Sequence, residues 1–269
     1  MAQRVAIAGF GAIGKVVAER LDHGIEGLTL ASVSARDKGR AEAAMMTGFL
    51  RPVPVLPLAR LGDEADIVVE CAPAALLREL AEPALIRGRL VMVLSCGALL
   101  DHFDLVDLAR GHGGRILVPS GALLGLDAVV ASAEGGISRV HMVTRKPPRG
   151  LVGAPYLKAN AVSVTGLSEP KRVFTGSARE AARGFPANVN VAAALALAGI
   201  GPDRTTIEIW ADPGLTRNVH QIEVEAEAAR FSMQIENVPS AENPRTGRLT
   251  ALSVIAALKK LSAALAIGT

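Results

Sequence analysis

The chain has 269 residues, of which 50% are hydrophobic, a length that suits one large or two modest domains with a buried core. Lysines and arginines outnumber aspartates and glutamates by only 29 − 26 = 3 and are scattered along the chain, which argues against a nucleic-acid partner. The two cysteines form no CxxC pair and have no histidine-rich cluster near them, so neither a disulfide framework nor a metal site is expected, and a reducing compartment fits best.

The N-terminal part alternates between strand-like and helix-like patterns. A buried strand is predicted at 3–9 and a helix at 12–21, joined by a turn rich in glycine. Further strand-like runs occur at 28–34, 67–71, 90–95 and 115–119. This alternation predicts a doubly wound parallel sheet of the Rossmann type, and we place this first, dinucleotide-binding domain at residues 1–120.

Apolar segments give no sign of export or of a membrane span. The start of the chain, residues 5–14, contains three regularly spaced glycines that explain it better than a signal peptide does. The longest later apolar run, 191–201, is about half as long as a membrane-spanning helix needs to be. We therefore expect a soluble, cytoplasmic protein without a membrane partner.

The pattern changes after residue 137. Long alternating runs at 137–148, 204–211 and 220–236 are typical of antiparallel strands with one solvated face. A helix is predicted at 187–198, between Pro186 and Gly199, and a last helix at 249–266. We therefore expect residues 121–269 to form an α+β domain with a largely antiparallel sheet that carries catalysis and dimerisation, and the C-terminal helix, about 245–269, to pack back near the first domain.

The glycine turn between the first strand and the first helix is a candidate cofactor site. It has the GxGxxG pattern, in which the glycines permit a tight turn, a close approach of pyrophosphate and close helix–strand packing. The N-terminus of the following helix offers N–H groups and partial positive charge to an anion. The predicted cofactor contacts in this part of the chain are Gly9, Gly11, Ala12, Ile13, Gly14 and, after the third strand, Ala72.

The end of the second strand bears on the choice between NAD and NADP. Enzymes that favour NAD usually place an acid there, which accepts a hydrogen bond from the ribose 2′-hydroxyl. Here Ser34 or Ala35 takes that place, and Arg36 is able to pair with a 2′-phosphate, so NADP is expected to be tolerated or preferred. Asp37 keeps NAD possible, and the alternative remains that Arg36 and Asp37 are only the solvated start of a helix.

Several longer motifs occur in a family's order along nearly the whole chain: AGFGAIG, PSGALLGLDA, TRKPP, FPANVNVAAALALAGIG, WADPGLTRNVHQIEVEAE and IENVPSAENPRTG. Together they resemble the L-aspartate dehydrogenase family. The resemblance implies oxidation of L-aspartate at C2 with NAD or NADP, giving iminosuccinate and then oxaloacetate and ammonia, with the imine serving as a precursor for NAD synthesis. It also implies that His220 is the active-site histidine and that Ala122 and an asparagine, Asn188 or Asn190, contact the NAD.

The expected chemistry agrees with this role of His220. A hydride leaves only from a neutral amine, so a group that titrates near neutral pH must handle protons at the reacting centre. The two carboxylates of the substrate need cationic donors, for which Arg145, Lys146 and Arg217 are candidates, although each of them also fits a surface charge. Further substrate-binding candidates near these motifs are Ser120, Thr144 and Asn190.

The sequence departs from the family's pattern at two places, and two rival functions have to be considered. The segment 226–231 lacks the glycine-rich turn common in the family, and Arg248 also departs from it. The first rival is a related sugar or polyol oxidoreductase, which typically has a Glu-Lys-Pro motif in the corresponding region. Residues 94–98 of this chain contain no lysine. The second rival, a non-catalytic NAD(P)-sensing protein, would have no need of a proton-handling group such as His220. Cys71 and Cys96 are predicted at the ends of buried strands and are interpreted as core residues rather than nucleophiles.

Overall fold

The computed structural model of the chain describes residues 2–186, 189–240 and 247–268. They form two compact units, one that ends at Gly121 and also takes in Thr250–Ile267, and one that comprises Ala122–Leu249. Each unit has a five-stranded sheet of its own.

The sheet of the first unit is parallel throughout. Its strands, in the spatial order β2-β1-β3-β4-β5, are β1 (Gln3–Ala8), β2 (Leu28–Ser34), β3 (Ile67–Glu70), β4 (Leu90–Val93) and β5 (Arg115–Leu117). Val5, Ile7, Val68 and Val91 are fully buried, as expected of parallel strands that are covered on both faces. The predicted parallel sheet is thus confirmed, and each predicted strand overlaps an observed one.

A remnant of a further strand lies beside β2. Val33 pairs in parallel with Val55, and the bond pattern Val33 N–H to Pro54 O (3.1 Å) and Leu56 N–H to Val33 O (2.8 Å) is that of a strand reduced to one bridge. With this bridge included, the order becomes the 3-2-1-4-5-6 arrangement of dinucleotide-binding folds. The switch point of the sheet therefore lies between β1 and β3, where the glycine turn follows β1.

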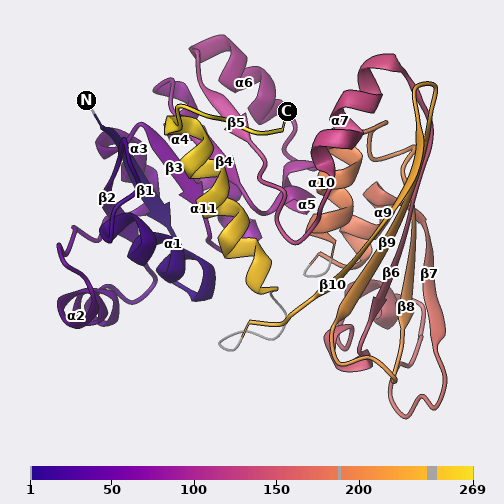
Figure 1. The fold of residues 1–269 in the computed structure, drawn as a ribbon. Helices are drawn as coiled ribbons and strands as arrows, with labels where there is room; N and C mark the ends of the chain where they lie inside the picture. Colours follow the sequence, from indigo (N-terminus) through magenta and orange to yellow (C-terminus); the bar gives the residue numbers. More distant parts are fainter. Residues whose placement is uncertain (1, 187–188, 241–246, 269) are drawn as a thin grey trace. The chain divides into compact units, whose positions relative to one another are not determined.

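The helices of the first unit include one from the C-terminal end of the chain. They are α1 (Ala12–Asp22), α2 (Lys38–Gly48), α3 (Leu61–Glu64), α4 (Leu77–Ile86), α5 (Cys96–Leu99), α6 (Asp104–His112) and α11 (Arg248–Ser262). Val254 and Leu258 of α11 belong to the same buried core as Val17 of α1 and Ile7 of β1. The C-terminal helix therefore lies along this sheet, as Figure 1 shows in yellow.

The sheet of the second unit is largely antiparallel, as predicted. It has the order β10-β9-β6-β8-β7, and only the β6–β8 pair is parallel. The strands are β6 (Ile137–Lys146), β7 (Lys171–Ser177), β8 (Thr206–Ala211), β9 (Asn218–Ala226) and β10 (Arg230–Asn237). The helices α7 (Leu126–Gly135), α9 (Ala178–Gly184) and α10 (Asn190–Ala198) cover one face (Figure 1). The short helix α8 (Pro155–Ala159) packs against α9.

Side chains on β6 alternate between the helix-covered face and the opposite face. Val140 and Met142 point to the helices and are buried, and the next two residues of the same parity, Thr144 and Lys146, are polar. Arg145 lies between them on the opposite face. The end of β6 therefore brings polar groups to the helix-covered face of this sheet, which we call the inner face. A hydrophobic core would have apolar side chains at these positions.

In the part of the chain that the structure describes, every helix is too short or too polar to cross a lipid bilayer.

Candidate active site

The glycine turn after β1 is packed tightly at its ends and open in its middle. A Cβ atom on Gly9, whose φ is +102°, would lie 2.6 Å from the carbonyl oxygen of Cys71, and one on Gly14 would lie 1.9 Å from the carbonyl oxygen of Gly9. A Cβ atom on Gly11 meets nothing within 4 Å. Gly11 is the N-cap residue of α1 and provides no side-chain cap, and the first turn of the helix contains no acidic residue. An open backbone at an uncapped helix N-terminus fits the pyrophosphate of a dinucleotide.

Other predicted cofactor residues follow the neighbouring strands at the same edge of the sheet. Ser34, the last residue of β2, is buried, whereas Arg36 is exposed. Asp37 caps α2 by accepting a hydrogen bond from Arg40 N–H (3.0 Å), so its carboxylate has a structural role. Ala72 follows β3 by two residues, and Ser120 follows β5 by three.

Glu70 is a buried carboxyl group at this edge that the sequence patterns did not single out. It is the last residue of β3 and is completely shielded from solvent. It accepts hydrogen bonds from the N–H groups of Leu94 (2.9 Å) and Ser95 (2.7 Å) and from the Ser95 hydroxyl (3.0 Å). Burial nevertheless raises the pKa of Glu70 above its ordinary value, against the effect of these donors. Glu70 thus joins the ends of β3 and β4 at the edge of the sheet where the glycine turn follows β1.

The two cysteines follow buried strands at this edge, Cys71 directly after β3 and Cys96 as the first residue of α5, three positions after β4. Burial raises the pKa of Cys96 to about 12, and the negative charge of Glu70 adds to that effect. Burial likewise raises the pKa of Cys71. Both thiols therefore stay protonated at neutral pH, which fits their interpretation as core residues.

In the second unit, His220 lies on the inner face of the sheet. It belongs to β9, pairs with Thr144 of β6 and Ile235 of β10, and is only 2% exposed. Its Nδ1 atom shares a hydrogen bond with the Thr144 hydroxyl, which is also buried. Because Nδ1 is engaged, Nε2 is the nitrogen that remains for a substrate.

Lys146 lies two residues beyond Thr144 on the same face. It is 5% exposed, and its carbonyl accepts a hydrogen bond from Asp212 N–H (2.8 Å). Burial lowers the pKa of Lys146 to about 8. Burial, and secondly the positive charge of Lys146, lower the pKa of His220 to about 3. At neutral pH the imidazole is therefore unprotonated in this structure.

Arg145 lies on the opposite face of β6 from His220. Its guanidinium carbon is 4.8 Å from the ring centre of Trp210, and it pairs with Asp212 at 3.7 Å. The strand alternation thus separates the two neighbouring cations of the TRKPP motif, and of these two only Lys146 shares a face with the histidine.

The other predicted site residues of this unit lie in loops or at helix ends. Arg217 is exposed, directly before β9, and Asn190 is the exposed first residue of α10. Ala122 accepts a hydrogen bond at its carbonyl oxygen from Asn237 Nδ2 (3.0 Å), a buried side chain that therefore holds the Ala122 loop in place. Asn188 lies outside the described residues.

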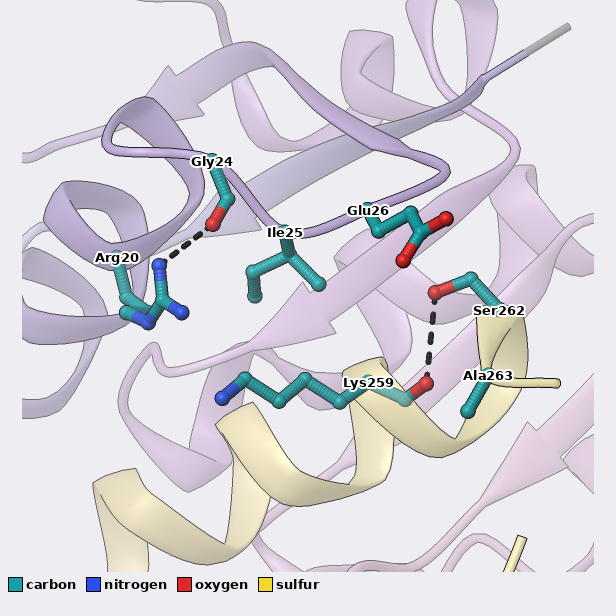
Figure 2. A pocket seen from close by; sticks show the side chains of 7 residues that line it. All are labelled: Arg20, Gly24, Ile25, Glu26, Lys259, Ser262 and Ala263. Carbon is teal, nitrogen blue, oxygen red and sulfur yellow. Dashed lines mark hydrogen bonds between the residues drawn. The ribbon is translucent and has the colours of Figure 1, made fainter. Parts of the chain in front are cut away.

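A small pocket in the first unit is unrelated to these groups. It has a volume of about 310 Å³ and lies between the end of α1, the loop before β2 and the end of α11 (Figure 2). Arg20 donates to the Gly24 carbonyl there (2.5 Å) and Ser262 to that of Lys259 (3.4 Å). The loop precedes β2, so the pocket lies at the amino edge of the parallel sheet, opposite the edge where dinucleotides bind in such folds.

Comparisons with known proteins agree with both halves of this description. Residues 127–261 match the family model described as the C-terminal domain of aspartate dehydrogenase, and residues 9–119 match that of the NAD-binding domain of homoserine dehydrogenase. The chain is 60% identical to an L-aspartate dehydrogenase of Bradyrhizobium diazoefficiens, over 99% of this chain and 94% of the relative. It is 57% identical to L-aspartate dehydrogenase 3 of Bordetella bronchiseptica, over 98% of this chain and 97% of the relative.

A solved structure shares the fold over the whole length. It is the aspartate dehydrogenase of Thermotoga maritima, with a TM-score of 0.74, 24% identity and coverage of 100% of both chains. At 24% identity this similarity shows the fold of the two units, and the family is shown by the relatives that are 57% and 60% identical.

Proposed function

The chain belongs to the L-aspartate dehydrogenase family, and from this premise we propose that it oxidises L-aspartate at C2, with NAD or NADP as the acceptor. The product is iminosuccinate, which water converts to oxaloacetate and ammonia. The observation that carries this proposal is the buried pair of His220 and Lys146 on one sheet face, in a chain 60% identical over nearly its whole length to an L-aspartate dehydrogenase.

The side chains have separate tasks in this reaction. A bound nicotinamide would supply the acceptor for the hydride that leaves C2 of the substrate. His220 takes the proton of the substrate ammonium at Nε2, because its Nδ1 is held by Thr144. Lys146 binds one carboxylate and Arg217 the other, with Lys146 favoured over Arg145 because it shares the face of His220.

The experiment that tests this function is a comparison of initial rates with L-aspartate, other amino acids, hydroxy acids and polyols, each with NAD and with NADP. Formation of reduced nicotinamide is followed by its absorbance. We expect L-aspartate to give the highest kcat/KM of the panel. Turnover confined to polyols, or cofactor binding without turnover of any compound, would contradict the proposal.

Both NAD and NADP are proposed as cofactors, and Arg36 is proposed to read the 2′ position. Support comes from Ser34 at the end of β2, where it cannot repel a phosphate, and from Asp37, whose carboxylate is engaged as a helix cap. Arg36→Ala is expected to weaken NADP binding roughly 10- to 150-fold, the equivalent of one charge-assisted contact, and to leave NAD binding nearly unchanged. Dissociation constants for the two reduced cofactors, measured by fluorescence, check this, and equal losses for both would remove Arg36 from 2′ recognition.

The quaternary structure and the pathway are part of the same proposal. We propose a cytoplasmic homodimer built on the second unit, whose iminosuccinate supplies NAD synthesis. The face of the second sheet that its own helices leave uncovered supports a dimer, because it carries the half-buried Trp210 between Arg145 (4.8 Å) and Arg172 (6.0 Å). Light scattering on the purified protein is expected to give twice the 27.8 kDa chain mass.

A further inference from the structure

The inner face of the second sheet holds two side chains that are both able to carry a positive charge. His220 is opposite Thr144 in the β6–β9 pairing, and Lys146 follows Thr144 by two residues on the same face. They are 2% and 5% exposed. The sheet therefore fixes two potential cations near each other, away from bulk water.

The elements packed around them carry little charge toward this face. β8 and β10 turn Ile209, Ala211, Ile235 and the uncharged Asn237 to it, and α10 has no titratable side chain. The two acids of α7, Asp127 and Glu134, are exposed, and Asp212 pairs with Arg145 of the opposite face. Among the described residues of β8, β10, α7 and α10, the acidic side chains are therefore exposed or lie outside this face.

Two like charges at such a site disfavour each other strongly, since the surroundings screen them poorly. Only one of the two groups is then readily charged, and the protonation of each depends on the state of the other. The intrinsically more basic lysine takes the proton first. The same ammonium that suits a carboxylate thus opposes proton uptake by the neighbouring imidazole.

We propose that Lys146 controls His220 electrostatically: its ammonium adds to the effect of burial and further disfavours protonation of the imidazole in the free protein, and a substrate carboxylate bound at Lys146 cancels this contribution. This inference rests on the proposed function for the identity of the carboxylate. The proton then moves from the substrate ammonium to Nε2 of His220, which leaves a neutral amine on the substrate and an imidazolium on the protein. Proton transfer is thereby tied to a correctly placed dianionic substrate.

The direct test follows the protonation of the His220 ring by NMR in the full-length protein labelled at histidine. A spectrum of His220→Asn identifies the resonances among those of the five histidines. Lys146→Met keeps an unbranched side chain of nearly the same length and removes its charge, so the titration midpoint of His220 is expected to rise by at least about one pH unit. Lys146→Arg is expected to keep the midpoint low, and an unchanged midpoint in Lys146→Met would overturn the proposal.

A matched control removes a cation from the other face of the same strand. Arg139 is exposed and pairs with Glu223 and Glu225, each at 3.2 Å. Arg139→Met is expected to leave the His220 midpoint where it is in the unchanged protein. Circular dichroism of both methionine variants verifies that the fold is intact, and a shift of equal size in Arg139→Met would overturn the specific role of Lys146.

Succinate, a dianion without the amine, tests the coupling to the ligand. We expect added succinate to raise the His220 midpoint in the unchanged protein but not in Lys146→Met, and a shift of equal size in both proteins would overturn the proposal. The titration in Lys146→Met needs no turnover, so it stands even if L-aspartate is not the substrate. Conversely, turnover of L-aspartate together with an unshifted midpoint in Lys146→Met would leave the proposed function intact and remove this inference.

Discussion

Replacing His220 with alanine is expected to lower kcat for L-aspartate roughly 100- to 10,000-fold, the range typical of a lost acid–base group. The imidazole is unprotonated at neutral pH in the free protein, because burial and, secondly, Lys146 lower its pKa to about 3. Without it, the substrate ammonium has no positioned acceptor for its proton. The affinity for NADH is expected to stay close to that of the unchanged protein, because the glycine turn belongs to the other unit.

The other histidine on the paired strands supplies the control for this variant. His141 belongs to β6 and bonds through Nδ1 to the Thr206 hydroxyl (2.8 Å), on the opposite side of the strand from Thr144. His141→Ala is expected to keep kcat within a few-fold of the unchanged protein. Steady-state rates and NADH titrations of both variants separate chemistry from binding. Normal turnover in His220→Ala would remove this residue from the mechanism.

The fold could be predicted from the sequence wherever one periodicity ran undisturbed. The apolar runs that became β1 to β5 gave the parallel sheet, and the alternating run at 220–236 gave β9 and β10. β7 was missed, because Lys171, Arg172 and Gly176 interrupt its short apolar core and leave no clear alternation. Its pairing with β8 supplies the order that the local sequence lacks.

The candidate site was predictable in its residue types but not in its arrangement. The TRKPP motif offers Arg145 and Lys146 as equal candidates, and only the pairing register of β6 with β9 places Lys146 on the face of His220. The contact between Thr144 and His220 spans 76 positions in the chain, so no local pattern announces it. Glu70 was missed for a similar reason, since an acid at the end of a strand is ordinary until its partners on β4 are known. Strand-end polarity next to a buried run is the one signal that could have pointed to it.

Alanine substitutions at Gly14 and Gly11 of the glycine turn are expected to have different effects on stability and on NADH binding, because the two positions differ in the space around them. Gly14 lies in α1, where alanine has the higher helix propensity, by about 1 kcal/mol. A methyl group there, however, would lie 1.9 Å from the Gly9 carbonyl oxygen and 3.1 Å from Ile7 Cγ2, so helix and strand must separate. We expect the clash to dominate: Gly14→Ala loses about 1–3 kcal/mol of unfolding free energy or more and binds NADH poorly.

Gly11→Ala separates the loss of a cofactor contact from the loss of a fold. Its backbone, with φ −98°, accommodates alanine, and the added methyl group meets nothing within 4 Å. The urea midpoint is therefore expected to stay unchanged, while the methyl group occupies the space that pyrophosphate needs and raises the dissociation constant for NADH roughly 5- to 150-fold. Urea unfolding and NADH fluorescence, measured on both variants, distinguish the two effects. A pyrophosphate that contacts the backbone at Gly11 leaves no room for a methyl group there. If Gly11→Ala binds NADH as tightly as the unchanged protein, the pyrophosphate therefore does not lie on this turn.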